Sequence, residues 1–311
     1  MGIIPIKVAD LNQMKPFEIL ESENIKSRFI EKYNQIHNSE DGEMFYESEK
    51  YNFQKLIANS KDLKECTGFS IYGILMDIAA MGLTIAPDSK PVLYILTRST
   101  NVGSQQQQVW EKRAYLQVSP YGELALRIQA GQILYADRPV VVYEGDTFQP
   151  GMNEYGRKFV KYMATVPRAS KKIIASFIGL TRPDGSIDFF WMMDEEIERL
   201  KKCSNKQNNR NNEAKDKSNA LYSSNDGQID IGFLEAKTLK HSLMVFPKIK
   251  IGQFTTLQQF EDEPKPGDYG LAQEDAHQLR ESKPEIQSFA ENEEKVNLPE
   301  SEEVTIEDDH F

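Results

Sequence analysis

The sequence predicts an α+β protein, in which helices come first along the chain and β-hairpins follow. Two observations support this class. Apolar residues recur at helical spacing in segments that precede residue 83. After residue 90, short segments rich in Val, Ile, Tyr and Phe face one another across turns, as the strands of hairpins do.

The N-terminal part is predicted to contain a flexible arm followed by three helices. Residues 1–12 are expected to form the arm, and helices are expected at residues 21–36 and 44–58. Either Thr67 or Ser70 can cap the start of the third helix, which Gly82 ends. The apolar residues of this helix share one face and predict a core helix: Ile71, Ile74, Leu75, Ile78 and Ala79.

The central part is predicted to alternate between strands, turns and one short helix. Residues 91–97 and 109–118 are expected to pair as a hairpin with a mobile polar tip. A sharp turn at residues 119–122 then leads into a short helix at 123–130, which Gly131 ends. A strand is expected at 133–144, because Val and Tyr are frequent there.

A basic run occupies residues 157–172, which contain six Lys and Arg residues and no acid, with Phe159 and Tyr162 interleaved. Cations in such a run can neutralise phosphates whatever the nucleotide sequence, and aromatic rings can stack on any base. The pattern therefore permits a surface for single-stranded nucleic acid. A solvated loop that faces water is the alternative interpretation.

The C-terminal part is predicted to hold one hairpin, two helices and two disordered segments. Residues 173–181 and 186–192 are expected to pair across Pro183, Asp184 and Gly185. Helices are expected at 194–202 and 231–245, with a polar disordered loop at 203–228 between them. The acidic tail, residues 253–311, is expected to be mostly disordered.

The charge of the chain is unevenly distributed. The net charge of −11 argues against nucleic acid, but residues 261–311 alone hold 17 acids and 4 bases. The body before them holds 31 acids and 33 bases and is mildly basic. No apolar run of membrane-spanning length and no signal peptide is recognised, so a cytoplasmic protein without membrane contact is expected. Cys66 and Cys203 lack the spacing of a disulfide or metal site and are expected to be reduced.

Enzymatic interpretations find no support in the sequence. No phosphate-binding Gly-Lys-Ser/Thr loop is present, and the four histidines are scattered, so neither an ATPase nor a zinc site is predicted. Glu195 and Glu196 are adjacent carboxylates, but they fall on a helix expected to be solvated. We therefore predict a protein with no catalytic site, no cofactor and no metal.

Residues 141–148 read Val-Val-Tyr-Glu-Gly-Asp-Thr-Phe, and a turn, a short helix and Gly131-Gln132-Ile133 come before them. Together with further motifs over roughly residues 60–250, they resemble the RecT family of single-strand annealing proteins. The family has a Val-Val-x-Glu-Gly-Asp-x-Phe block, and the chain has it at residues 141–148. A turn, a short helix and a Gly-Gln-Ile sequence precede this block in the family and at residues 119–133 here, although Tyr121 stands where the family usually has Lys or Arg. Other shared positions are Leu63, Cys66, Ser70-Ile71, Met81-Gly82-Leu83 and Lys237-Thr238.

The resemblance implies a fold and a function. The fold is a twisted antiparallel sheet of β-hairpins packed with helices, in a single annealing core at residues 13–252. The function is ATP-independent annealing of complementary single DNA strands in homologous recombination, in a protein encoded by a phage or prophage. The implied partners are single-stranded DNA, the annealed duplex, further copies in a ring or helical filament, a phage-type exonuclease and a host single-strand-binding protein.

The candidate DNA-binding residues are taken from the basic run, the predicted hairpin base and two helices. Two of them have structural alternatives: Arg127 can pair with Glu123 four residues earlier, and Tyr121 can be a packed turn residue. The candidates are Lys112, Arg113, Tyr121, Arg127, Arg157, Lys158, Lys161, Lys171, Lys172, Lys237 and Lys240.

Two other functional classes are consistent with the same residues. A general single-strand-binding protein would use the same cations and rings to protect DNA without annealing it. A scaffold protein would not bind DNA at all.

Overall fold

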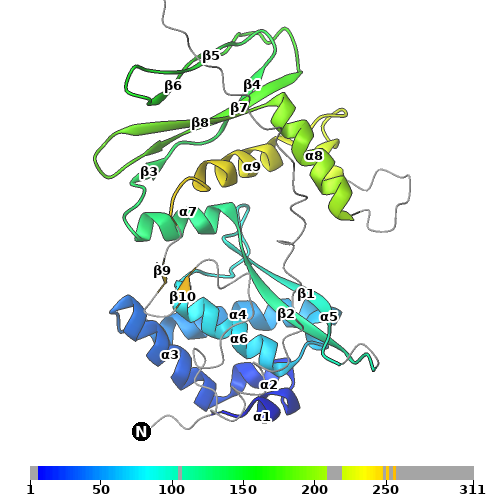
Figure 1. The fold of residues 1–311 in the computed structure, drawn as a ribbon. Helices are drawn as coiled ribbons and strands as arrows, with labels where there is room; N and C mark the ends of the chain where they lie inside the picture. The colour runs from blue at the N-terminus through cyan, green and yellow to red at the C-terminus, as the bar shows by residue number, and fades with distance from the viewer. Residues whose placement is uncertain (1–5, 104–106, 209–218, 248–249, 252–254, 257–311) are drawn as a thin grey trace, which may run out of the picture.

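The computed structural model describes residues 6–103, 107–208, 219–247, 250–251 and 255–256. The protein is α+β, as predicted, and all its strand pairs are antiparallel. Figure 1 shows a helical part with one β-hairpin at the N-terminal end of the chain and a sheet-containing part after it. Helix α7 (Pro120–Gln129) lies where the two parts meet.

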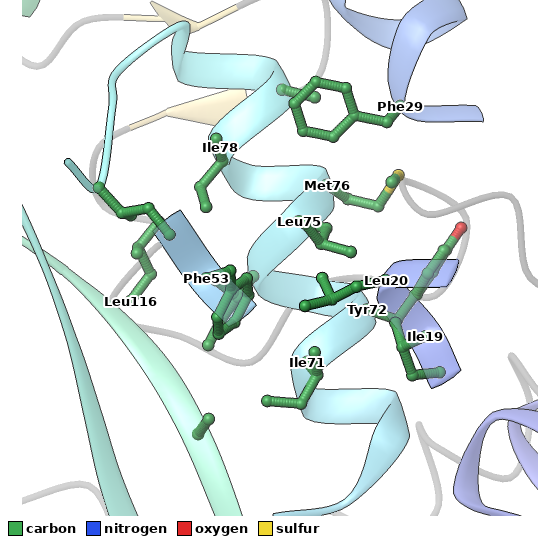
Figure 2. Packing of buried hydrophobic residues seen from close by; sticks show 14 of the residues in the cluster. Ile19, Leu20, Phe29, Phe53, Ile71, Tyr72, Leu75, Met76, Ile78 and Leu116 are labelled. Atoms are coloured by element: carbon green, nitrogen blue, oxygen red, sulfur yellow. The ribbon is translucent and has the colours of Figure 1, made fainter. Parts of the chain in front are cut away.

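Six helices of the described chain lie in the N-terminal part, and the sixth lies at the centre of its core. Figure 2 shows Ile71, Leu75 and Ile78 of α6 among side chains from α2, α3, α4 and strand β2. The helices are α1 (Val8–Gln13), α2 (Pro16–Glu21), α3 (Glu23–His37), α4 (Gly42–Asn59), α5 (Lys61–Lys64) and α6 (Gly68–Met81).

The ends of α6 follow the local sequence signals. The Thr67 hydroxyl accepts a hydrogen bond from the backbone N–H of Ser70, so Thr67 is the N-cap of the two candidates. Gly82 ends the helix with a φ of 63°, a conformation that glycine adopts without steric cost.

Residues 6–12 are ordered, although they were expected to belong to a flexible arm. Most of them lie in α1, and Leu11 is fully buried in the N-terminal core. The backbone of Leu11 approaches α6 so closely that a Cβ at Gly68 would meet the Leu11 carbonyl oxygen at 2.0 Å. A helix of six residues is too short to show a helical periodicity, so α1 was not predicted from the sequence.

Strands β1 (Leu93–Asn101) and β2 (Trp110–Val118) form the first hairpin, as predicted, in an unbroken register from Leu93↔Val118 to Asn101↔Trp110. One face of this hairpin packs on α6 and contributes Leu93, Ala114 and Leu116 to the N-terminal core.

The turn predicted at residues 119–122 is instead the first turn of α7. The Ser119 hydroxyl accepts from the backbone N–H of Gly122, and Pro120 occupies the first helical position. No room exists for a side chain at Gly122, because a Cβ there would lie 2.2 Å from the Val92 carbonyl oxygen. Gly131 follows the helix with a φ of 67°.

The largest sheet is built around β7 (Ile173–Thr181), which pairs with β8 (Ile187–Met193) on one edge, as predicted. The strand predicted at 133–144 is two strands, β3 (Tyr135–Ala136) and β4 (Val140–Tyr143), which pair with different parts of β7. Pro139 lies in the break and has no N–H to donate to a ladder, which accounts for the interruption.

A separate hairpin, β5 (Thr147–Met152) and β6 (Lys158–Met163), carries the first part of the basic run. The antiparallel strands therefore form several sheets rather than one. Strands β9 (Lys250–Ile251) and β10 (Thr255–Thr256) pair as a short ladder, and the rest of the predicted acidic tail lies outside the described residues.

Among the described residues, the sheet-containing part also holds α8 (Asp194–Asn208), a 3-10 turn η1 (Ala220–Tyr222) and α9 (Ile231–Leu243). The segment predicted as a disordered loop, 203–228, is thus helical up to Asn208. After residue 218 it is anchored by Tyr222, which is buried and packs edge-on against Phe233. The polar composition of this segment gave no indication that Tyr222 would be buried. Residues 209–218 lie outside the described part.

The apolar cores of the two parts are distinct, and α7 contributes to both. Leu126 of α7 belongs to the N-terminal core, whereas Tyr121 and Leu124 pack against a cluster that includes Ile133, Leu180 and Leu239. Helix α7 is therefore the shared element through which the two parts are held together.

Within the part of the chain that the structure describes, no helix has the length and apolar character needed to span a membrane.

Candidate nucleic-acid interface

The β5–β6 hairpin sorts the residues of the basic run onto two faces. Side chains directly opposite one another in an antiparallel pair point to the same side, and successive residues alternate. Phe148 pairs with Tyr162, whereas Gly151 pairs with Phe159 and Gln149 with Lys161. The two aromatic residues of the run, Phe159 and Tyr162, consequently belong to opposite faces.

The inner face packs on the sheet through Phe148 and Tyr162. The Phe148 ring stacks on Phe177 of β7 with centroids 5.6 Å apart, and Tyr162 contacts the same ring edge-on at 5.3 Å. The Tyr162 hydroxyl also donates to Asp146 at 3.1 Å. Tyr162 is therefore committed to packing and cannot present its ring to a base.

Asp146 ties the two ends of this hairpin together. Its carboxylate accepts from the backbone N–H groups of Tyr143 and Thr165 at 3.0 and 2.8 Å, in addition to the Tyr162 hydroxyl. Burial acts to raise the pKa of Asp146, but these hydrogen bonds outweigh it and the pKa is lowered. The ionised aspartate thus fixes the position of the hairpin.

The outer face carries an exposed ring beside an exposed cation. Phe159 is 38% exposed, and its ring lies across Gly151, where a Cβ would come within 2.6 Å of the ring. Lys161 is exposed on the same face and forms no ion pair with any residue that the structure describes. Glycine at position 151 therefore leaves space for Phe159 to lie flat at the surface.

Arg157 and Lys158 lie at the turn end of the hairpin. Arg157 is exposed, and its backbone N–H donates to the Asn153 side chain at 2.8 Å, which closes the turn. Lys158 is exposed, and its Nζ lies 5.0 Å from the Trp191 ring centroid and 5.7 Å from that of Phe190. Lys158 is thus positioned against the edge of the main sheet by aromatic contacts.

The end of the basic run folds back onto β4. The Arg168 guanidinium lies 3.7 Å from the centroid of the Tyr143 ring. Lys171 is exposed, whereas the Lys172 ammonium pairs with Glu144 at 3.3 Å. Hydrogen bonds from Ser170 and Lys172 lower the pKa of Glu144. Lys172 must therefore share its charge between Glu144 and any phosphate.

Lys112 and Arg113 are adjacent on β2 and point to opposite sides of the first hairpin. The Lys112 ammonium lies 2.7 Å from carboxylate oxygens of both Asp62 and Glu65, and these hydrogen bonds raise its pKa. Arg113 pairs with Glu111 at 3.3 Å. The structure therefore does not bring this predicted pair together as one phosphate site.

Arg127 is a buried structural residue, which corrects its assignment to the DNA surface. The residue is 1% exposed, and its side chain pairs with Glu123, the alternative that helical spacing suggested. The guanidinium also donates to Gln132 at 2.9 Å and to the Pro247 carbonyl at 3.0 Å. Arg127 thus fastens the chain after α9 to the end of α7.

Tyr121 packs in the core cluster shared by α7 and α9. It is therefore a packed residue, which was the alternative to a role in stacking on DNA. Its ring is half-buried, and the Lys90 ammonium lies 5.1 Å from the ring centroid. Burial raises the pKa of the Tyr121 hydroxyl.

Lys237 and Lys240 lie one turn apart on α9, as predicted, but in different surroundings. Lys240 is exposed. Lys237 is half-buried, with its ammonium 4.9 Å from the Phe233 centroid, and burial, helped by the charge of Lys240, lowers its pKa. Of the two, Lys240 is the one whose charge is open to a ligand.

The partner strand of the basic run was missed, although the sequence held a signal for it. Residues 147–150 alternate in exposure, and Asn153 to Gly156 form a turn in which Gly156 has a φ of 75°. The period of two and the Asn and Gly of the turn are local hairpin signals. Pro150 within the segment argued against a strand, but this ribbon is separate from the main sheet and tolerates it.

Among the described residues, no group of three or more His, Cys, Asp or Glu side chains could hold a metal ion.

The model of the RecT family matches residues 48–223, which run from α4 through both predicted hairpins to the end of η1 and make up more than half of the chain. A comparison with curated proteins finds no match.

Proposed function

Because the chain belongs to the RecT family, we propose that it binds single-stranded DNA and anneals complementary strands without ATP during homologous recombination. Family membership supports a role in recombination and annealing in general. The more specific proposal draws its support from the outer face of the β5–β6 hairpin, where Phe159 and Lys161 lie side by side on an exposed strand.

Annealing has two physical requirements, and this face is suited to both. The protein must hold the phosphate backbone so that two anionic strands can approach, and exposed cations do this for any sequence. It must also leave the hydrogen-bonding edges of the bases free, which a ring does when it stacks on the face of a base. Residues 157–172 supply the cations and the ring and carry no carboxylate that would repel DNA.

The family relationship also leads us to propose the partners of the protein. They are single-stranded DNA, the annealed duplex, further copies of the chain in a ring or helical filament, and a phage-type exonuclease that produces single strands. A host single-strand-binding protein is a further proposed partner. The proposed setting is the cytoplasm of a bacterial or phage-infected cell, and no catalytic site or cofactor is invoked.

The decisive experiment measures pairing of two complementary oligonucleotides, one with a donor dye and one with an acceptor dye, in the absence of nucleotide. We expect the purified protein to accelerate pairing over a reaction without protein. Strict dependence on ATP would refute the proposal. Tight binding with pairing slower than the control would instead identify a general single-strand-binding protein, and absence of binding at low salt would identify a scaffold.

A further inference from the structure

The first hairpin, β1–β2, has an outer face to which the proposed function assigns no role. The unbroken register places Tyr94, Leu96 and Arg98 of β1 on one side, opposite Gln117, Tyr115 and Arg113 of β2. The other side, with Leu93, Ala114 and Leu116, is buried on α6. Since one face is fixed to the core helix, the outer face is held on a rigid base.

Three apolar side chains are exposed on this outer face. Tyr94 is 44% exposed, and Leu96 and Tyr115, which lie directly opposite each other, are each 37% exposed. Strand residues on one face are separated by about 6.6 to 6.8 Å, so Tyr94 and Leu96 are neighbours along β1. The three side chains therefore form one contiguous apolar patch rather than scattered apolar positions.

The same face holds two guanidinium groups directly opposite each other, Arg98 and Arg113. Like charges in a direct cross-strand pair repel each other, and among the described residues Arg113 pairs with a carboxylate, that of Glu111, whereas Arg98 does not. Arg98 is exposed and lies over the Tyr115 ring, with its guanidinium carbon 5.4 Å from the ring centroid. An anion bound between the two arginines would relieve this repulsion.

We propose that the outer face of β1–β2 is a second platform for single-stranded DNA, on which bases stack on Tyr94 and Tyr115 while Arg98 meets the backbone phosphate. This inference rests on the proposed function, because it assumes that single-stranded DNA is the ligand. Aromatic rings with an adjacent arginine are the elements that sequence-independent single-strand sites combine. This platform lies on the helical part of the protein, whereas the β5–β6 hairpin lies on the sheet-containing part.

The charges favour DNA over a second copy of the chain as the occupant. A second copy that docked here through a two-fold axis would use the same patch on both subunits and would bring its own two arginines against these two. On this face, Arg98 and Arg113 lie directly beside the apolar patch, and Arg98 covers the Tyr115 ring. Single-stranded DNA can meet the arginines with its phosphates and the tyrosine rings with its bases.

The test compares the double variant Y94A/Y115A with Y94F/Y115F in fluorescence-anisotropy titrations of a labelled oligothymidylate. An abasic oligonucleotide of the same length is the matched ligand, because it keeps the phosphates and lacks the bases. Tyr51→Ala is the matched control, since Tyr51 is 58% exposed on α4 and also lies beneath a cation, Lys55. Far-ultraviolet circular dichroism and urea unfolding establish that each variant is folded.

We expect the alanine variant to lose roughly fivefold to a hundredfold in affinity for oligothymidylate per ring. The phenylalanine variant and Tyr51→Ala should bind as the wild type does, and all proteins should bind the abasic strand equally. Equal affinity of the alanine variant and the wild type for oligothymidylate would overturn the platform and leave the proposed function standing. Failure of the wild type to bind either strand would instead refute the proposed function.

Photocrosslinking of unaltered protein keeps the inference testable if the alanine variant does not fold. An oligonucleotide that carries 5-iodouracil should crosslink to peptides containing Tyr94 or Tyr115, and mass spectrometry of the digest identifies them. Absence of these crosslinks, with crosslinks present elsewhere, would overturn the platform. A loss of self-association in the alanine variant, seen by sedimentation velocity without loss of oligothymidylate affinity per chain, would assign the face to a second copy and equally overturn the inference.

Discussion

Replacing Lys161 and Lys112 separately by alanine tests whether a lysine must lack a carboxylate partner to serve as a phosphate contact. Both residues lie on hairpin strands, and both were candidates from the sequence. Lys161 is exposed and has no ion pair with the residues that the structure describes, whereas two carboxylates hold Lys112 at 2.7 Å each. We therefore expect Lys161→Ala to weaken DNA binding and Lys112→Ala to leave it unchanged.

The expected size follows from counterion release. Each phosphate contact to a single strand contributes about 0.7 to the slope of log affinity against log salt. Lys161→Ala should flatten this slope by about 0.7, so the ratio of wild-type to variant affinity should fall by about 0.4 decade between roughly 50 and 200 mM salt. Replacing Lys158, Lys161, Lys171 and Lys172 together should flatten it by about 2 to 3, since Lys172 already shares its charge with Glu144.

The assay is equilibrium anisotropy with one oligonucleotide at five or more salt concentrations, repeated with a second sequence. The change in slope should be the same for both sequences, because phosphate contacts carry no sequence information. An unchanged slope for Lys161→Ala would show that DNA does not follow the β5–β6 hairpin. A slope flattened as much by Lys112→Ala would show that DNA displaces the two carboxylates, which contradicts the reasoning from ion pairs.

Three further predictions concern stability and stacking. Arg127→Met should lower the free energy of unfolding in urea by about 3 kcal/mol, because Glu123 and the Pro247 carbonyl lose a buried partner. It should leave the slope of log DNA affinity against log salt unchanged, and an undiminished free energy of unfolding would contradict the structural role. Glu49 is a buried residue of α4, 1% exposed, and burial raises the pKa of its carboxyl above 4.5. The folded state therefore binds this proton more tightly, and the stability contributed by Glu49 should fall as pH rises from about 4.5 through its folded pKa; a difference in unfolding free energy between wild type and Glu49→Ala that is flat from about pH 4 to 7 would argue against this. Phe159→Ala should reduce affinity for single strands by roughly 1 kcal/mol or more with little change in stability, whereas Tyr162→Ala should lower the free energy of unfolding by about 2 kcal/mol. Anisotropy measures the first effect and urea unfolding the second, and the reverse pattern would show that Tyr162, not Phe159, lies on the exposed face of the hairpin.

The features that the sequence predicted well are those with local causes. The ends of α6 follow from Thr67 and Gly82, which act on backbone groups within one helical turn. The β7–β8 hairpin follows from two strand-like segments and a turn in which Gly185 has a φ of 80°. Ser119 and Pro120 were an equally local helix-start signal, and the predicted turn there missed it.

The features that escaped prediction depend on contacts between distant residues. A period of two shows that Phe159 and Tyr162 lie on opposite faces, but only the contact of Tyr162 with Phe177 decides which face is inward. The spacing of Glu123 and Arg127 was visible, whereas the hydrogen bond from Arg127 to Pro247 joins residues far apart in the chain. For the same reason, the sequence could not show that Lys112 would be captured by carboxylates from a different element.

The division of the apolar core has a consequence for the order in which the chain folds during synthesis. Every buried member of the N-terminal core lies between Ile6 and Leu126, so this core needs no residue of the later sheet. Domains commonly fold as units as they emerge from the ribosome, N-terminal first. The helical part can therefore close before β7 has been translated. Helix α7, already anchored through Leu126, then offers Tyr121 and Leu124 as a ready surface on which the sheet assembles.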